Sequence, residues 1–233
     1  MDVKKQDRFT ASASGALRNP WLYFWTLLLA LGFAYVAGVL CGRSMPLQAR
    51  NGGYQEFIKL LISAPILFWM GAGHAFKPFR EGEWPRLASQ LLLVGLACFA
   101  GLHWFYLQMI PAINFSLTGS DLAHMGLAAR GVFLAAGVLL LGLFGYHLRL
   151  ARRDGILLPY ASAFVGGILV IAVLSWLLRH RASVHIHHYF LFGYFIPFLR
   201  FRNPVTLLCL GFCAGVYVEG VSEWSMALLW DFH

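Results

Sequence analysis

Three histidines stand within four residues of the sequence, His185-Ile-His187-His188, between the last two apolar runs of the chain. On a helix His185 and His188 share a face, whereas in an extended segment His185 and His187 do. Imidazole is a common ligand of transition metals, and three imidazoles beside a membrane are costly unless something binds them. The spacing therefore predicts that His185, His187 and His188 are metal ligands.

Two carboxylates follow in the last apolar run. Glu219 and Glu223 are four residues apart, so on a helix both project from one stripe. A mixed set of imidazole and carboxylate ligands suits zinc, iron or copper. We expect Glu219 to complete the ligand set together with His103, and Glu223 to act as a general base toward water whose pKa the metal lowers.

Two other interpretations of the same residues stay open. Buried carboxylates one helical turn apart are also suited to carrying protons or cations, and an ionisable residue inside an apolar span is a functional-site candidate by default. Alternatively, Glu219 and Glu223 form a purely structural polar cluster with a basic residue. The candidates for that pairing are Arg130, Arg179 and Arg181.

The segments that must position these residues are apolar enough to lie in a membrane. Of the 233 residues, 59% are hydrophobic and 12% charged, against roughly 25% charged in a soluble domain. Residues 21–42 form an uncharged run that reaches about 33 Å as a helix, enough for a bilayer core of about 30 Å. The pattern predicts an all-α integral membrane protein with about seven transmembrane helices, at 21–42, 55–76, 87–110, 125–148, 159–178, 184–200 and 204–230.

The sixth of these segments, 184–200, is short and contains Pro197. It lies near the lower length limit of about 17 residues for a crossing helix, so it either crosses the membrane fully or re-enters as a half-helix shielded by protein. The second arrangement would turn the C-terminus inward.

Lysine and arginine set the orientation of the spans. With the N-terminus inside, twelve lie on the inner side and five on the outer side, and Arg130 falls within a span. The inner set is Lys4, Lys5, Arg8, Arg18, Lys77, Arg80, Arg86, Arg149, Arg152, Arg153, Arg200 and Arg202, and the outer set is Arg43, Arg50, Lys59, Arg179 and Arg181. This bias predicts a cytoplasmic basic N-terminal segment, 1–20, a single polytopic domain, 21–233, and a C-terminus on the opposite side.

This orientation brings the candidate site residues to a common depth. Seven of the nine histidines, together with Glu219 and Glu223, fall at the outer side, whereas His74 and His147 fall near the other side. Histidine was not used to set the topology, so this agreement is independent of it.

The net charge of +8 resides in short loops and does not indicate nucleic-acid binding. The expected partners are the bilayer, including its acidic headgroups, and a lipid or other apolar small molecule. We therefore expect metal-dependent chemistry at an outward-facing intramembrane site. A proton- or cation-translocating subunit and a non-catalytic subunit of a larger membrane complex are the alternatives. The sequence names neither the metal nor the substrate.

Overall fold

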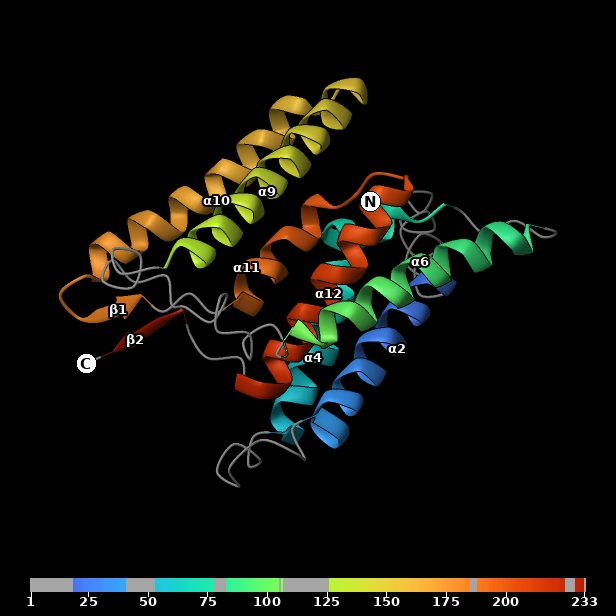
Figure 1. Ribbon diagram of the computed structural model, residues 1–233, viewed down its shortest axis with the longest axis horizontal. Coiled ribbons are helices and arrows are strands. Elements are labelled where there is room, and N and C mark those ends of the chain that lie inside the picture. Colours follow the sequence, from blue (N-terminus) through green and yellow to red (C-terminus); the bar gives the residue numbers. More distant parts are fainter. Residues whose placement is uncertain are drawn as a thin grey trace, which may run out of the picture.

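The structure, a computed structural model, describes residues 19–40, 53–77, 83–104, 106, 126–184, 188–224 and 229–232. Helices make up nearly all of this part of the chain (Figure 1). The elements are α2 (Pro20–Tyr35), η1 (Val36–Leu40), α4 (Gly53–Leu67), η3 (Phe68–Ala72), α5 (Gly73–Ala75), α6 (Trp84–Leu102), α9 (Leu127–Arg153), α10 (Leu157–Leu178), β1 (Ala182–Val184), α11 (His188–Phe195), η4 (Ile196–Phe198), α12 (Pro204–Trp224) and β2 (Trp230–Phe232).

Six helical segments of the described chain are long and apolar enough to cross a membrane, which is compatible with a multi-pass membrane protein. They are Pro20–Val39, Tyr54–Ala75, Trp84–Leu102, Leu127–Arg153, Leu157–Leu178 and Pro204–Glu223. These correspond to six of the seven spans expected from the sequence. The remaining segment, 184–200, contains as helix, among its described residues, only the eight residues of α11 and the three of η4. It is therefore not a helix of spanning length.

Helix α12 is the central helix of the bundle. Of its most apolar stretch, 72% of the residues are buried, whereas none are in the corresponding stretches of α9 and α10. A helix that is apolar on all sides has no face to present to water, and here it packs against α2, α4, α6 and α11. Glu219 and Glu223 therefore lie on the most deeply buried of the candidate membrane spans.

Glycines let α12 approach α6 at backbone distance. A methyl group on Gly215 would overlap the backbone oxygen of Cys98, and one on Gly101 would overlap that of Phe212. Gly211 lies four residues before Gly215, on the same face, and meets the backbone of Val94. Small residues four apart allow such close helix contacts inside membranes.

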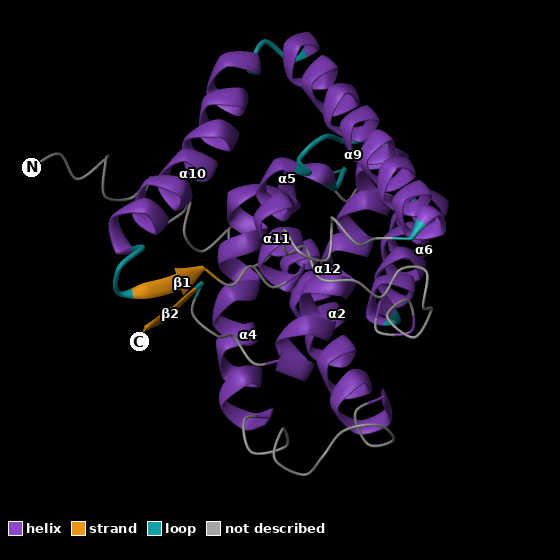
Figure 2. Cartoon of the chain, turned by 60° about the vertical axis from the view of Figure 1, so that its left-hand side comes forward, coloured by secondary structure: helices purple, strands orange, loops and turns teal. Residues whose placement is uncertain are grey.

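Helices α9 and α10 form a hairpin, which lies beside the bundle in Figure 1 and resembles an inverted V in Figure 2. Its turn requires Gly155, whose φ of +72° lies in the left-handed region that favours glycine. Near this turn, two tyrosine hydroxyls of the hairpin form hydrogen bonds with the bundle. The hydroxyl of Tyr160 donates to the backbone oxygen of Phe198 (3.1 Å), and that of Tyr146 donates to Oδ1 of Asn203 (3.3 Å).

The segment 188–203 runs from one end of α12 to the other. His188 lies beside Glu219, near the C-terminal end of α12, whereas Asn203 precedes its first residue and contacts the end of α9. Strand β1, after α10, pairs antiparallel with β2, after α12. The C-terminal ends of α10 and α12 therefore lie at the same end of the molecule as His188.

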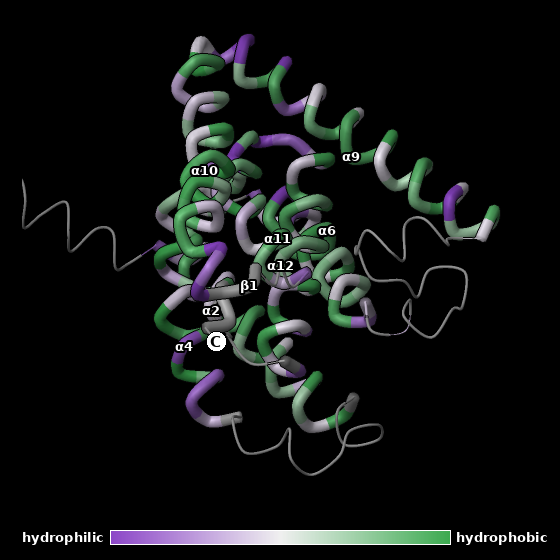
Figure 3. Tube along the Cα trace, turned by 90° about the vertical axis from the view of Figure 1, so that its left-hand side faces the viewer, coloured by the Kyte–Doolittle hydropathy of each residue, from purple (hydrophilic) through white to green (hydrophobic). Residues whose placement is uncertain are grey.

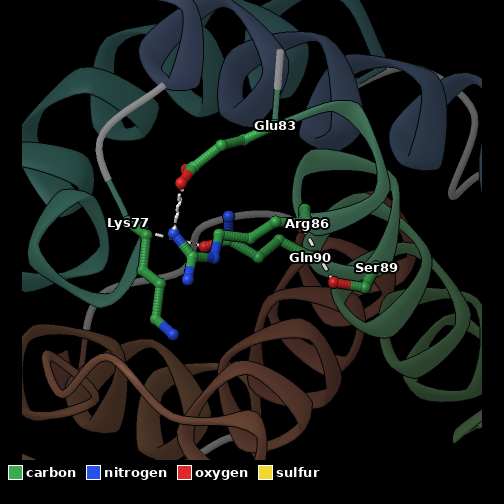
Figure 4. Close-up of polar contacts among 5 residues, drawn as sticks. All are labelled: Lys77, Glu83, Arg86, Ser89 and Gln90. Atoms are coloured by element: carbon green, nitrogen blue, oxygen red, sulfur yellow. Dashed lines mark hydrogen bonds and ion pairs between the residues drawn. The ribbon is translucent and has the colours of Figure 1, made fainter. Parts of the chain in front are cut away.

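At the opposite end, polar contacts fix the start of α6 (Figure 4). The Glu83 carboxylate accepts from the Arg86 guanidinium through both oxygens, at 2.8 Å each. The side-chain oxygen of Gln90 accepts from the backbone N–H of Lys77 at 2.8 Å. Because Gln90 is buried, this bond ties the segment after α5 firmly to the second turn of α6.

Candidate functional site

A histidine and a glutamate meet where α11 packs on α12. Nε2 of His188, the first residue of α11, lies 2.8 Å from Oε2 of Glu219. The side chain of Glu219 is 1% exposed and that of His188 is 21% exposed. The pair is therefore buried on the glutamate side and reachable from outside through the imidazole.

Gly220 makes this approach possible. A methyl group at Gly220 would lie 2.5 Å from Cβ of Tyr189 and 3.0 Å from Nε2 of His188. Any larger residue here would force the start of α11 away from α12. The dipeptide Glu219-Gly220 thus supplies a carboxylate and, beside it, the space that the imidazole needs.

Glu223 extends the site by one helical turn. Glu223 is 8% exposed, and its carboxyl group lies close enough to that of Glu219 to interact with it. It also lies close enough to His188 to interact with it electrostatically. Two buried carboxyl groups in contact repel each other unless a proton or another cation is shared between them.

One oxygen of Glu219 receives no hydrogen bond from the part of the chain that the structure describes. Oε2 is satisfied by His188, but Oε1 is buried and has no donor among the described residues. A buried carboxylate oxygen without a donor is costly, and such atoms typically face a water or an ion. The arrangement of His188, Glu219 and Glu223 is thus one that favours a cation.

Aromatic side chains surround the imidazole. The ring of Trp104 lies 6.4 Å from that of His188 and 5.4 Å from that of Phe192. Tyr189, next to His188, is buried. Apolar walls limit water and strengthen electrostatic interactions inside the site.

Of the residues expected at the site, the structure brings together His188, Glu219 and Glu223. His185 and His187 lie outside the described residues. His103 lies toward α2: its Nδ1–H donates to the backbone oxygen of Phe99 (2.8 Å), so its Nε2 accepts from the Tyr35 hydroxyl (3.1 Å). No hydrogen bond between described residues joins His103 to His188 or Glu219.

Within the described part of the chain, no group of three or more histidine, cysteine, aspartate or glutamate side chains is arranged to hold a metal ion. His188, Glu219 and Glu223 therefore do not form a complete metal site by themselves. The expected depth relationship does hold for the described residues. His103 and His188 lie at the end of the bundle that carries Glu219, whereas His147 contacts Thr206 at the start of α12.

Sequence reasoning did not identify the residues that shape the site around His188. Trp104 was not singled out, because one tryptophan at a helix end gives no signal that distinguishes it from an interfacial anchor. Tyr189 lies in a stretch rich in aromatic residues, 189–201, which gives no signal that separates it from its neighbours. A glycine directly after a buried glutamate was the one available signal, since it indicates a close approach of another segment.

Comparisons with known protein families, curated proteins and solved structures give no match to this chain.

Proposed function

We propose that this protein is a multi-pass membrane protein that binds a transition-metal ion at the His188–Glu219 pair. The observation that carries the proposal is a buried glutamate with one oxygen held by an imidazole and the other without a donor among the described residues. Two ligands of one tetrahedral zinc ion lie about 3.3 Å apart, given bonds of about 2.0–2.1 Å. Nε2 and Oε2 lie 2.8 Å apart, so a metal replaces the shared proton after a shift of about half an ångström.

The additional ligands that the site requires come from the adjoining sequence. Successive Cα atoms are about 3.8 Å apart, so covalent geometry alone keeps His187 within about 4 Å of His188, and His185 within about 11 Å, between Cα atoms. Both residues lie outside the described part of the chain. His103 is a less suitable ligand, because both its ring nitrogens are already hydrogen-bonded.

The expected chemistry is metal-dependent reaction of a lipid or another apolar substrate. A bound metal supplies Lewis acidity and lowers the pKa of water to about 7. Glu223, in contact with Glu219, is placed to accept a proton as a general base. The Trp104 and Phe192 rings present an apolar surface next to His188, which suits an apolar substrate.

Proton or cation translocation is the second candidate, and the contact between Glu219 and Glu223 favours it. A carboxyl pair that shares a proton, with a partly exposed imidazole at one side, is able to exchange that proton with the surroundings. This function needs no metal ligand beyond the described residues.

For the topology, we propose a cytoplasmic N-terminus, an opposite C-terminus and a full crossing by residues 188–203. The helical part of this segment, α11 with η4, spans only about 18 Å. It nevertheless connects the two ends of α12, and the non-helical residues after it cover the remaining distance. The end of the bundle that carries Lys77, Arg153 and Arg202 is then the cytoplasmic end, as the excess of basic residues predicts.

Elemental analysis of the purified wild-type protein tests the proposal. We expect about one transition-metal ion per chain at neutral pH. A metal-free protein that dissipates a proton gradient in liposomes would instead establish the second candidate. A protein that neither contains metal nor moves ions would refute both.

A further inference from the structure

A separate cavity lies at the other end of the molecule, beside the turn between α9 and α10. Its volume is about 430 Å³, and it is lined by Tyr146, Arg149, Leu150 and Arg153. These residues recur at intervals of three and four along α9 and therefore share one face of the helix. Ligand pockets in proteins typically measure about 300–1,000 Å³, so the cavity is large enough for a small charged group.

The two arginines that line the cavity repel each other. Arg149 and Arg153 are four residues apart on the helix, and like charges at this spacing are destabilising. Among the described residues neither forms an ion pair with a carboxylate. Arg149 and Arg153 are exposed residues whose guanidinium groups offer N–H donors of the kind that bind anions, and a phosphate group matches the paired donors of a guanidinium.

The position of the cavity favours a phosphate that carries acyl chains. Helix α9 is a candidate membrane span with no buried residue in its most apolar stretch, and Arg153 is its last residue. Figure 3 shows hydrophobic residues along α9 and α10 and hydrophilic ones where the two helices join. Leu139, two turns before Tyr146 on the same stripe, is 62% exposed, so an apolar surface continues from the cavity along α9.

Tyr146, which lines the cavity, is hydrogen-bonded to the bundle. The hydroxyl of Tyr146 donates to Asn203, and the side-chain N–H of Asn203 donates to Oγ1 of Thr206 at 2.9 Å. Oγ1 of Thr206 in turn lies 3.1 Å from Nε2 of the buried His147. This network connects the cavity wall at Tyr146 to the start of α12.

We propose that Arg149 and Arg153 bind the phosphate group of an anionic phospholipid at the end of α9. The proposal rests on the membrane placement given above but not on metal binding at His188 and Glu219. Basic pockets at the ends of transmembrane helices are a known mode of headgroup recognition. Here the recognition depends on two guanidinium groups at one cavity, not on the general positive charge of that end of the molecule.

The test uses the full-length protein in a zwitterionic detergent and measures its thermal stabilisation by added phosphatidylglycerol. Binding to the folded state alone raises the midpoint of unfolding in a concentration-dependent way, which gives an apparent Kd. The loss of a charge-assisted hydrogen-bond partner should weaken binding at least about tenfold in Arg149→Gln and in Arg153→Gln. Arg152→Gln is the matched control, because Arg152 has the same charge in the same turn but does not line the cavity. It should change the Kd less than about threefold.

Equal losses in all three variants would show that only the surface charge matters and would overturn the proposal. So would equal stabilisation by phosphatidylcholine, or tight binding of inorganic phosphate with the same arginine dependence, which would assign the cavity to a free anion. Metal content, measured on the same preparations, should not change in any of the three variants. It distinguishes failure of the lipid site from failure of the metal site at the other end of the bundle.

Discussion

His188 and Glu219 are thirty-one residues apart in the sequence, and their Nε2 and Oε2 atoms lie 2.8 Å apart. The contact joins the first residue of α11 to the central helix α12, so it is both part of the candidate site and a structural link. A variant that merely unfolds the protein would be uninformative. Variants of the pair therefore need to preserve shape where the chain allows it.

We predict that Glu219→Gln loses the bound metal while the protein stays folded. Glutamine has nearly the same shape, and its oxygen still accepts a hydrogen bond from His188, but it lacks the negative charge that a metal ligand supplies. Mutation of a residue that only supports a metal ligand weakens metal binding about 10–100-fold. Mutation of a ligand itself should therefore weaken metal binding more than about 100-fold. Metal titration of the purified variant measures the change.

His74→Ala is the control, since His74 has an exposed side chain and contacts Arg202 at the opposite end of the bundle. Its metal content should equal that of the wild type. Full metal occupancy in Glu219→Gln, or equal loss in His74→Ala, would rule out a site at Glu219.

Gly220→Ala should displace His188 from Glu219. The added methyl group would lie 2.5 Å from Cβ of Tyr189, and both helices would have to shift. Overpacking of this kind costs about 1–3 kcal/mol, measured as a decrease in the free energy of unfolding in detergent. Gly142→Ala on α9 is the matched control because nothing lies within 4 Å of its Cβ position. It should leave stability unchanged or raise it, because alanine favours a helix over glycine.

Gly215→Ala should separate α6 from α12 and destabilise the whole bundle. The new methyl group would overlap the backbone oxygen of Cys98, which cannot move without moving α6. We expect a loss of about 3 kcal/mol, at the upper end of the usual cost of overpacking. Gly145→Ala, on an open face of α9, serves as the control in the same denaturation assay. Equal stability of the two variants would contradict the close helix contact.

The apolar segments could be predicted from the sequence because each depends only on local composition. Six of the expected spans correspond to helices of spanning length, and Glu219 and Glu223 do share a face of α12 with His188 beside them. The length of the sixth segment was less predictable, since α11 ends at Phe195 and only the contacts of His188 and Asn203 show that the segment connects both ends.

The position of His103 could not be predicted from its depth alone. Depth fixes how far along the bundle a residue lies, but not the direction of its side chain around the helix axis. His103 comes directly after α6 and contacts Tyr35 of α2, whereas Trp104, the next residue, contacts His188. A difference of one residue in helical phase therefore decides which of the two lies near the candidate site.

Thr206→Val should destabilise the protein by about 1–3 kcal/mol without changing its metal content. Nδ1–H of His147 donates to the backbone oxygen of Leu143, so its Nε2 accepts from the Thr206 hydroxyl, and valine would leave that buried nitrogen without a donor. Ser162→Ala removes an exposed hydroxyl from α10 and should have no measurable effect. If Thr206→Val and Ser162→Ala are equally stable, the hydrogen bond between His147 and Thr206 makes no contribution to the free energy of unfolding.

Reporter fusions after Arg153 and after His233 should report opposite sides of the membrane, with Arg153 in the cytoplasm. The basic residues at the end of the bundle near Asn203 favour the cytoplasm. In the proposed topology, residues 188–203 carry the chain from the outer end of α10 back to that end, so α12 then returns it outward. A fusion after Leu178 is the internal control and should match the C-terminal fusion, because β1 pairs with β2. A cytoplasmic signal from the C-terminal fusion, with Arg153 also cytoplasmic, would mean that residues 188–203 re-enter the membrane without crossing it.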